Sequence, residues 1–214
     1  MSETFMRDWD YKATQKSFSE RIKDAISPQS PIKERIDYVC RILDIQTSRI
    51  DQIYNRLYER DRRLFEYLVN FYMRRDMSRV KVYANELAGI RKLEKVILHS
   101  KYALQAVRMR LELVKDVGDV AVTLAPALRV IGSVRSWLSG VWPEAERELS
   151  QVGNVIGNML TEVGHPPSSQ FVFEAGSEEA ERILNEARIM VERELRKTFA
   201  EIPTATSEVE KTNA

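Results

Sequence analysis

Cysteine, histidine, glycine and proline are all scarce in this chain of 214 residues. The single cysteine, Cys40, cannot form a disulfide within the chain, which fits a reducing compartment. Two histidines and one cysteine are too few for the usual zinc ligand sets. We therefore expect no disulfide framework, no metal site and no cofactor.

Turn-forming residues are almost missing from the first half of the chain. No proline occurs between Pro31 and Pro126, and the only glycine in that interval before Gly118 is Gly89. A compact domain that contains sheets needs turn residues about every ten positions. The sequence therefore predicts an all-α protein with long helices in its first half and shorter, jointed helices in its second.

Long apolar segments are absent as well. The longest, residues 120–131, is interrupted by Pro126 and Arg129, and it is far shorter than the roughly 20 residues that a membrane-spanning helix requires. Residues 1–10 are polar and lack the apolar segment of a secretory signal. We expect a cytoplasmic protein.

Catalytic signatures are missing too. The chain has no glycine-rich phosphate loop and no nucleophile elbow. Glu162 and His165 have the spacing of a di-iron motif, but Val96 stands where the required second motif would place a glutamate before His99. We expect His165 to lie in a loop, His99 on a helix surface and Cys40 in packing, and we predict no enzymatic activity.

What the chain does contain is a long heptad repeat. Between residues 32 and 71, apolar positions recur alternately every four and every three residues, with polar interruptions at Gln46 and Arg60. This spacing predicts one continuous helix with a coiled-coil-like seam. Ser30 is a suitable N-cap for it, with Pro31 at the first helical position.

A second heptad run follows a short polar break at residues 74–78. It extends from Val80 to Val114 with interruptions at Glu94 and Lys101, and Ser78 is a candidate N-cap. Because a short connection joins two long helices, we expect an antiparallel hairpin. Its predicted seam consists of Ile36, Leu43, Ile50, Leu57, Leu64, Leu87, Ile90, Ile97 and Leu104.

The second half reads as shorter helices at 119–138, with a bend near Pro126, and at 143–162, followed by a last helix from Glu178 to about Phe199. The expected organisation is an N-terminal arm at 1–29, a helical core at 30–163, a linker at 164–176, an acidic C-terminal regulatory helix at 177–200 and a disordered tail at 201–214.

The formal net charge of +1 conceals a reversal of sign along the chain. Residues 30–140 contain 21 Lys and Arg against 13 Asp and Glu, whereas residues 141–214 contain 7 against 14. A basic hairpin attracts polyanions such as an anionic membrane or a nucleic acid. The acidic second half is able to compete for the same surface, which predicts autoinhibition.

Two sets of residues are candidates for membrane binding. The first is an apolar group in the arm, because large apolar side chains beside cations suit a shallow interfacial anchor; packing of the arm on a hairpin is the alternative. The second is the group of cations around the hairpin turn. These candidates are Phe5, Met6 and Trp9 in the arm, and Arg74, Arg75, Arg79 and Lys81 at the turn.

The start of the second long helix, residues 83–95 with the sequence YANELAGIRKLEK, is similar to the most recognisable stretch of the ESCRT-III membrane-remodelling proteins. Together with the basic hairpin, the short jointed helices and the acidic last helix, residues 30–165 resemble this family. The form looks closest to a CdvB-type paralogue of the archaeal cell-division branch.

The resemblance implies a non-enzymatic subunit that forms filaments with itself and with related paralogues on anionic membranes and constricts them. It places the protein at the division site, peripheral to the membrane. It also implies an AAA ATPase that grips the C-terminal region, although the residue types of the binding motif occur here at a different spacing. The positions concerned are Leu184, Arg188, Val191 and Leu195.

Two other functions remain open on the residues alone. A basic coiled coil attracts the phosphates of nucleic acids, so the chain could bind nucleic acid or organise chromosomes. No nucleic-acid motif supports that alternative, and we expect no nucleic-acid partner. A helical adaptor would explain the hairpin but would leave the reversal of charge without a role.

Overall fold

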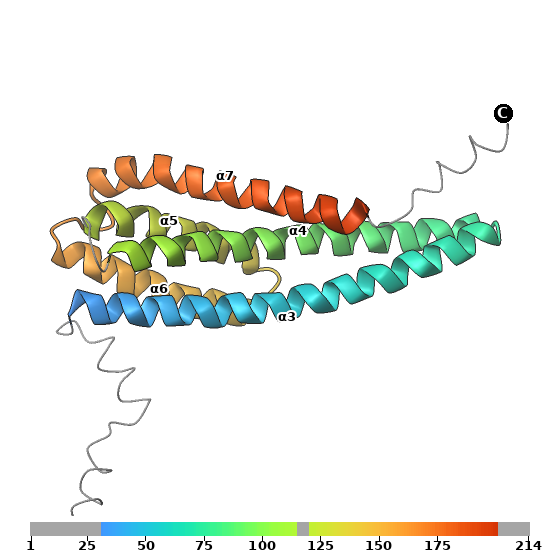
Figure 1. The fold of residues 1–214 in the computed structure, drawn as a ribbon, viewed down its shortest axis with the longest axis horizontal. Coiled ribbons are helices and arrows are strands. Elements are labelled where there is room, and N and C mark those ends of the chain that lie inside the picture. The colour runs from blue at the N-terminus through green and yellow to red at the C-terminus, as the bar shows by residue number, and fades with distance from the viewer. Residues whose placement is uncertain (1–30, 115–119, 201–214) are drawn as a thin grey trace, which may run out of the picture.

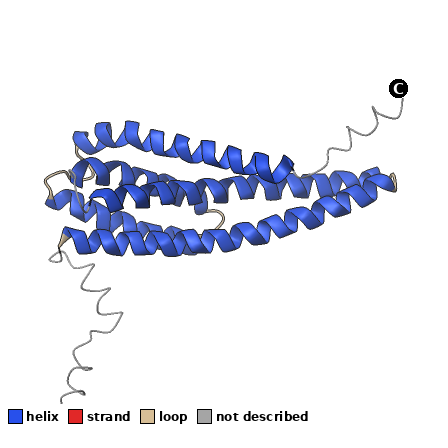
Figure 2. Ribbon diagram, viewed as in Figure 1, coloured by secondary structure: helices blue, strands red, loops and turns tan. Residues whose placement is uncertain are grey.

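The computed structural model describes residues 31–114 and 120–200, and every element in these ranges is a helix (Figure 2). In chain order the helices are α3 (Ile32–Met73), α4 (Met77–Val114), α5 (Val120–Leu138), α6 (Pro143–Glu162) and α7 (Gln170–Ala200). The predicted all-α fold is confirmed.

Helices α3 and α4 form the predicted antiparallel hairpin (Figure 1). With 42 residues in α3 and a rise of about 1.5 Å per residue, the hairpin is roughly 60 Å long. Both expected N-caps are wrong. Pro31 rather than Ser30 is the N-cap of α3, and the Asp76 carboxylate, rather than Ser78, accepts the backbone N–H of Arg79 at 3.2 Å in the first turn of α4.

Helices α5 and α6 form a second, shorter pair that covers the open end of the hairpin (Figure 1). Helix α5 packs on α4, and α6 packs on both α5 and α3. Helix α5 continues through Pro126. Helix α6 has the predicted bounds, with Pro143 in its first turn followed by Glu144 and Glu146, an arrangement that suits the positive end of the helix dipole.

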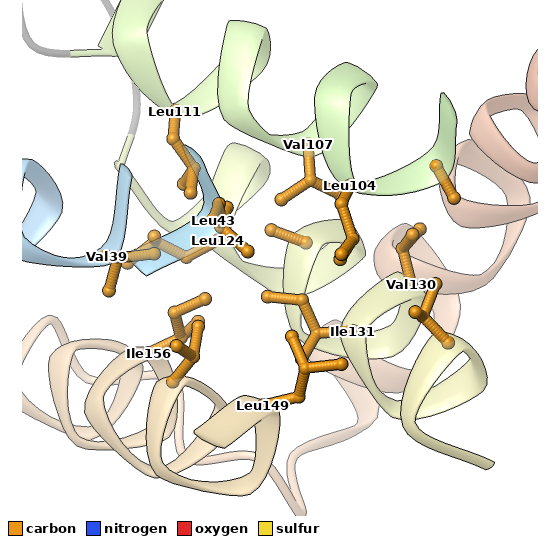
Figure 3. Close-up of a cluster of buried hydrophobic side chains, with 14 of the residues drawn as sticks. Val39, Leu43, Leu104, Val107, Leu111, Leu124, Val130, Ile131, Leu149 and Ile156 are labelled. Carbon is orange, nitrogen blue, oxygen red and sulfur yellow. The ribbon is translucent and has the colours of Figure 1, made fainter. Parts of the chain in front are cut away.

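The main hydrophobic core lies between the body helices, with buried side chains from α3, α4, α5, α6 and α7. Figure 3 shows side chains from α3, α4, α5 and α6 converging on one another, among them Val39 and Leu43, Leu104, Val107 and Leu111, Leu124, Val130 and Ile131, and Leu149 and Ile156. All of these side chains are buried. The amphipathic stripes of α3 and α4 are therefore covered at the open end of the hairpin by the short helices.

Helix α7 begins earlier than the sequence predicts. The expected linker 164–176 runs only to about residue 169, because α7 starts at Gln170 rather than near Ser177. The Ser169 hydroxyl oxygen accepts the backbone N–H of Val172 at 3.4 Å, and Val172 is buried against the core. Gly176 does not break the helix: a Cβ at this position would lie 3.2 Å from the backbone carbonyl of Ala125. The glycine thus allows close contact between α5 and α7.

Helix α7 runs back along α4 and α5 (Figure 1). It ends before the hairpin does, so the closed end of the hairpin projects beyond the other helices (Figure 1). In the described residues, the fold therefore consists of a packed body of five helices and a projecting tip formed by the closed end of the α3–α4 hairpin.

Candidate functional site

The turn between α3 and α4 forms the projecting end of the molecule. Helix α3 ends at Met73, and Arg75 adopts a positive φ of 57° that lets the chain reverse. The Asp76 carboxylate then pairs with the Arg79 guanidinium, with 3.3 Å between Oδ2 and Nε. These contacts hold the turn in a defined conformation.

The four cations predicted at this turn, Arg74, Arg75, Arg79 and Lys81, are all exposed. Only Arg79 makes an ion pair there, with Asp76; within the described part of the chain, none is formed by Arg74, Arg75 or Lys81. The structure therefore brings these charges together at one end of the molecule.

Exposed apolar side chains, which sequence reasoning missed, lie among the same cations. Tyr72 is 62% exposed, Met73 77% and Met77 54%. Val82 is also exposed, one turn further along α4. The signal was present in the sequence as apolar residues within and beside the polar break at 74–78. We call Tyr72, Met73, Arg74, Arg75, Met77, Arg79 and Lys81 the tip surface.

Aromatic rings pack between α3 and α4 next to the tip surface. The Tyr83 ring on α4 lies 5.2 Å from the Phe71 ring and 5.8 Å from the Tyr67 ring on α3. The Arg79 guanidinium lies over the Phe71 ring at 5.1 Å. A small separate core of Leu64, Leu87 and Ile90 follows toward the body. These contacts join the two helices close to the turn.

The structure places the predicted seam residues between the packed helices. Leu57 is half-buried and contacts both hydrophobic clusters. The other eight are buried: Ile36, Leu43, Ile50, Leu64, Leu87, Ile90, Ile97 and Leu104. The heptad spacing therefore selects side chains that hold the hairpin together and that are not available for binding a partner.

A buried polar layer separates the small tip core from the main core. Asp61 and Glu94 are both buried, and Arg91 donates to Asp61 with 2.7 Å between Nε and Oδ2. Glu94 Oε1 has no hydrogen-bond partner among the described residues. Burial raises the pKa of the Glu94 carboxyl to about 7, the Asp61 charge adds to this, and Arg91 opposes it.

The other polar interruptions of the heptad pattern join helices to one another. Gln46 is buried and donates to the Glu148 carboxylate on α6, which also pairs with Arg49 at 2.8 Å. Arg60 and Lys101 instead pair across the hairpin, with Glu86 and Asp51 respectively, each at 2.5 Å. Polar seam positions thus make specific contacts between helices.

Ion pairs also hold α7 to the hairpin. The Arg110 guanidinium on α4 lies 2.9 Å from the Glu179 carboxylate and 3.5 Å from that of Glu186, both on α7. Beneath this contact, α7 buries Ala180, Ile183 and other apolar side chains against the core. Charge and apolar packing therefore act together to dock α7.

His99 is not the surface histidine that the sequence predicts. Its ring stacks on Trp137 of α5, with centroids 4.4 Å apart, and its Nε2 lies 3.0 Å from the backbone carbonyl oxygen of Leu184 on α7. The side chain is half-buried. The reason is that α7 covers this face of α4, which the heptad pattern does not reveal.

The four predicted partner-helix residues do not share one exposed face. Val191 is buried, Leu184 and Leu195 are half-buried, and only Arg188 is exposed. Arg188 hydrogen-bonds within α7 to Asn185 at 2.8 Å. In this conformation, the apolar members of the set face the rest of the protein.

The remaining predictions concern the arm, the two other reactive side chains and membrane spanning. Phe5, Met6 and Trp9 lie outside the described residues. Cys40 is buried and His165 lies in the connection between α6 and α7, as predicted. In residues 31–114 and 120–200, no helix combines the length and apolar character needed to cross a membrane, and no cluster of potential metal ligands forms.

Comparison with known proteins gives two informative relatives. The chain is 34% identical over 205 residues to Cell division protein B1 of Sulfolobus acidocaldarius, covering 96% of this chain and 92% of that protein. It is 31% identical over 166 residues to Cell division protein B of the same organism, covering 78% of this chain and 64% of that protein. No protein-family model and no solved structure matches the chain.

Proposed function

The chain belongs to the CdvB-type branch of the archaeal ESCRT-III family, whose relatives support a role in archaeal cell division, and from this premise we propose that it is a subunit of a membrane-remodelling filament. The subunit assembles with itself and with related paralogues on anionic membrane and drives constriction and scission at the division site. Its role is structural rather than enzymatic.

The observation that carries the proposal is the long basic hairpin. It presents exposed cations at the tip surface, of which Arg74, Arg75 and Lys81 form no ion pair among the described residues, and along α3, where Arg62 and Arg63 are also exposed. A stiff rod with exposed charge on its sides suits both side-by-side assembly and attraction to anionic lipid, which is worth about 1 kcal/mol for each cation near the surface. This supports peripheral association with the membrane.

The docked α7 suggests how assembly is controlled. Helix α7 covers part of α4 through the contacts of Arg110 with Glu179 and Glu186, and of His99 with Leu184. In the proposed cycle this conformation is autoinhibited, and release of α7 uncovers the hairpin surface that neighbouring subunits use.

An AAA ATPase is the further partner that we propose for the C-terminal region. Leu184, Val191 and Leu195 would contribute apolar contacts to such a partner, but they face the body of the protein while α7 is docked. The ATPase would therefore bind only the released helix. Arg188, which is exposed, is the one residue of this set that it would reach in the docked form.

Vesicle flotation compared with a DNA gel shift tests the proposed partner. The purified chain should float with vesicles of phosphatidylcholine and phosphatidylglycerol, should not float with phosphatidylcholine alone, and should leave duplex DNA unshifted at the same salt concentration. A DNA shift without flotation would replace the proposal with the nucleic-acid alternative, since exposed cations attract phosphates of either kind. If the protein neither floats with anionic vesicles nor shifts DNA, the helical adaptor would be the remaining function.

A further inference from the structure

The tip surface combines exposed apolar side chains with cations at the closed end of the hairpin, which no other helix of the described residues covers. Tyr72, Met73 and Met77 lie in the last turn of α3 and the first turn of α4, so they are at the extreme end of the rod. Each is more than half exposed. Single exposed apolar side chains are ordinary on soluble proteins, but a contiguous group of them marks an interaction site.

The charge of the same region indicates the kind of partner. Residues 62–83 contain six Lys and Arg against two Asp and Glu. Asp76 is already paired with Arg79, so the surface presents an excess of free positive charge. A protein partner would need an acidic surface with an apolar hollow, whereas an anionic bilayer offers negative headgroups above an apolar layer over its whole area.

Packing between α3 and α4 next to the tip surface makes the closed end of the hairpin rigid. The stacked rings of Phe71 and Tyr83 and the small core of Leu64, Leu87 and Ile90 hold the two helices together up to the turn. Thioether side chains such as Met73 and Met77 are flexible and adapt to irregular apolar surroundings. The arginines beside them are able to extend to the headgroups while their apolar stems stay in contact with the acyl region.

We propose that the tip surface inserts end-on into anionic membrane, with Tyr72, Met73 and Met77 entering the interface and Arg74, Arg75, Arg79 and Lys81 binding lipid phosphates. This inference rests on the proposed membrane association and names a surface for it, separate from the N-terminal arm. It predicts that the hairpin meets the membrane at its closed end.

A double substitution of exposed residues tests the apolar part of this contact. The variant Met73→Ser/Met77→Ser should keep the wild-type melting temperature, since both side chains are exposed, and should bind phosphatidylcholine–phosphatidylglycerol vesicles about tenfold more weakly, because two apolar side chains no longer enter the interface. The matched control is Met109→Ser, which removes a methionine that is 59% exposed on α4, far from the turn. It should bind as the wild type does.

An environment-sensitive fluorophore tests the insertion itself. It is attached through Met73→Cys, and through Met109→Cys as the control; Cys40 is 5% exposed and stays unlabelled. With anionic vesicles, the probe at residue 73 should shift its emission to shorter wavelength and the probe at 109 should not. With phosphatidylcholine vesicles alone, neither probe should shift.

The outcomes separate this inference from the proposed function. Wild-type flotation with no shift at residue 73 and no loss in the double variant would overturn tip insertion and leave membrane association standing. Absence of flotation for the wild type would overturn both. If the double variant instead loses lipid-free assembly, measured by pelleting, and keeps vesicle binding, the tip surface contacts a second copy of the chain and the inference is wrong.

Discussion

Glu94 shows how a single residue can make the hairpin sensitive to pH. Its carboxyl lies between the main core and the tip core, next to Asp61 and Arg91, with one oxygen that has no partner among the described residues. Tyr54 on α3 is a further titratable group close to this carboxyl, and the carboxylate of Glu194 on α7 also acts on Tyr54. A buried carboxyl favours its neutral form, so the folded protein holds a proton that the unfolded chain releases.

The first prediction follows from this proton. The pKa of Glu94 is about 7 in the folded protein and 4.5 for the ordinary group, so the folded state binds more protons between these values and its stability falls as pH rises through this window. The loss is about 3 kcal/mol at most. The variant Glu94→Gln should match the wild type near pH 5 and exceed it near pH 8, as measured by urea unfolding. Equal pH profiles for the two proteins would contradict the assignment.

The second prediction concerns Ile90, which belongs to the small hydrophobic cluster near the hairpin turn. It is buried with Leu64 and Leu87, and truncation of a buried isoleucine to alanine costs about 2–4 kcal/mol. Ile90→Ala should therefore lower the free energy of unfolding by that amount, measured with urea. The control Val82→Ala, at a position 64% exposed on the same helix, should change it by less than about 0.5 kcal/mol. Equal effects would remove Ile90 from the seam.

At the scale of residues, sequence reasoning identified which positions are buried better than what they contact. The heptad period identified Ile50, Ile97 and Leu104 as seam positions because coiled-coil packing itself produces that period. It flagged Gln46 and Glu94 as interruptions, but it did not predict their contacts. Those depend on Glu148 of α6 and on Asp61, and a periodic pattern in one helix carries no information about a polar partner elsewhere.

At the scale of elements, the contact between α5 and α7 depends on Gly176. The chain passes this point as helix because the surrounding packing outweighs the low helix propensity of glycine. A larger side chain here would meet the backbone of Ala125 and the Arg129 side chain, both 3.2 Å from the position of a Cβ. Arg129 also donates to the Val172 carbonyl oxygen and to the Ser177 hydroxyl, both at 3.3 Å, so these contacts would move as well.

The third prediction uses this close contact. Gly176→Val should destabilise the protein by about 1–3 kcal/mol, because backbone atoms cannot move aside as a flexible side chain can. Gly89→Ala is the control: it lies on α4, nothing lies within 4 Å of its Cβ position, and the higher helix propensity of alanine should stabilise the protein by about 0.5–1 kcal/mol. Thermal unfolding measures both. A stabilising Gly176→Val would show that α7 does not approach α5 here.

The predicted bounds of the helices succeeded or failed according to local signals. Helix α6 was correctly bounded because Pro143 and the acids after it mark a helix start. Helix α7 was predicted to start too late, since the expected linker 164–176 includes Gly176, whereas this glycine lies within the helix and serves close packing. Tertiary contact of this kind is not visible in a single sequence, so the predicted linker was too long.

At the scale of the whole molecule, the basic first half of the chain and the acidic second half form ion pairs with each other. Acidic α7 lies on basic α4, where Arg110 meets Glu179 and Glu186. The Arg35 guanidinium binds the Glu162 carboxylate at the end of α6, with 2.6 Å between Nη1 and Oε1, and this hydrogen bond lowers the pKa of Glu162. The sequence indicated that such contact was possible, but which helix faces which required the structure.

The fourth prediction concerns release of α7. Removing residues 165–214, which contain 10 Asp and Glu against 6 Lys and Arg, should make the protein assemble at lower concentration, since α4 is uncovered. The full-length variant Arg110→Glu should shift assembly in the same direction by repelling Glu179 without removing apolar cover. Pelleting in solution and on anionic vesicles measures both. If both proteins stay monomeric wherever the wild type does, α7 is not an inhibitor.

The central claim is that this chain forms filaments that remodel membrane, and electron microscopy of the purified full-length protein on phosphatidylcholine–phosphatidylglycerol vesicles tests it most directly. The account predicts filaments, spirals or rings on the vesicles, with bilayers drawn into narrow tubes, and smooth vesicles when phosphatidylglycerol is omitted. Smooth anionic vesicles that carry bound but unassembled protein would contradict it.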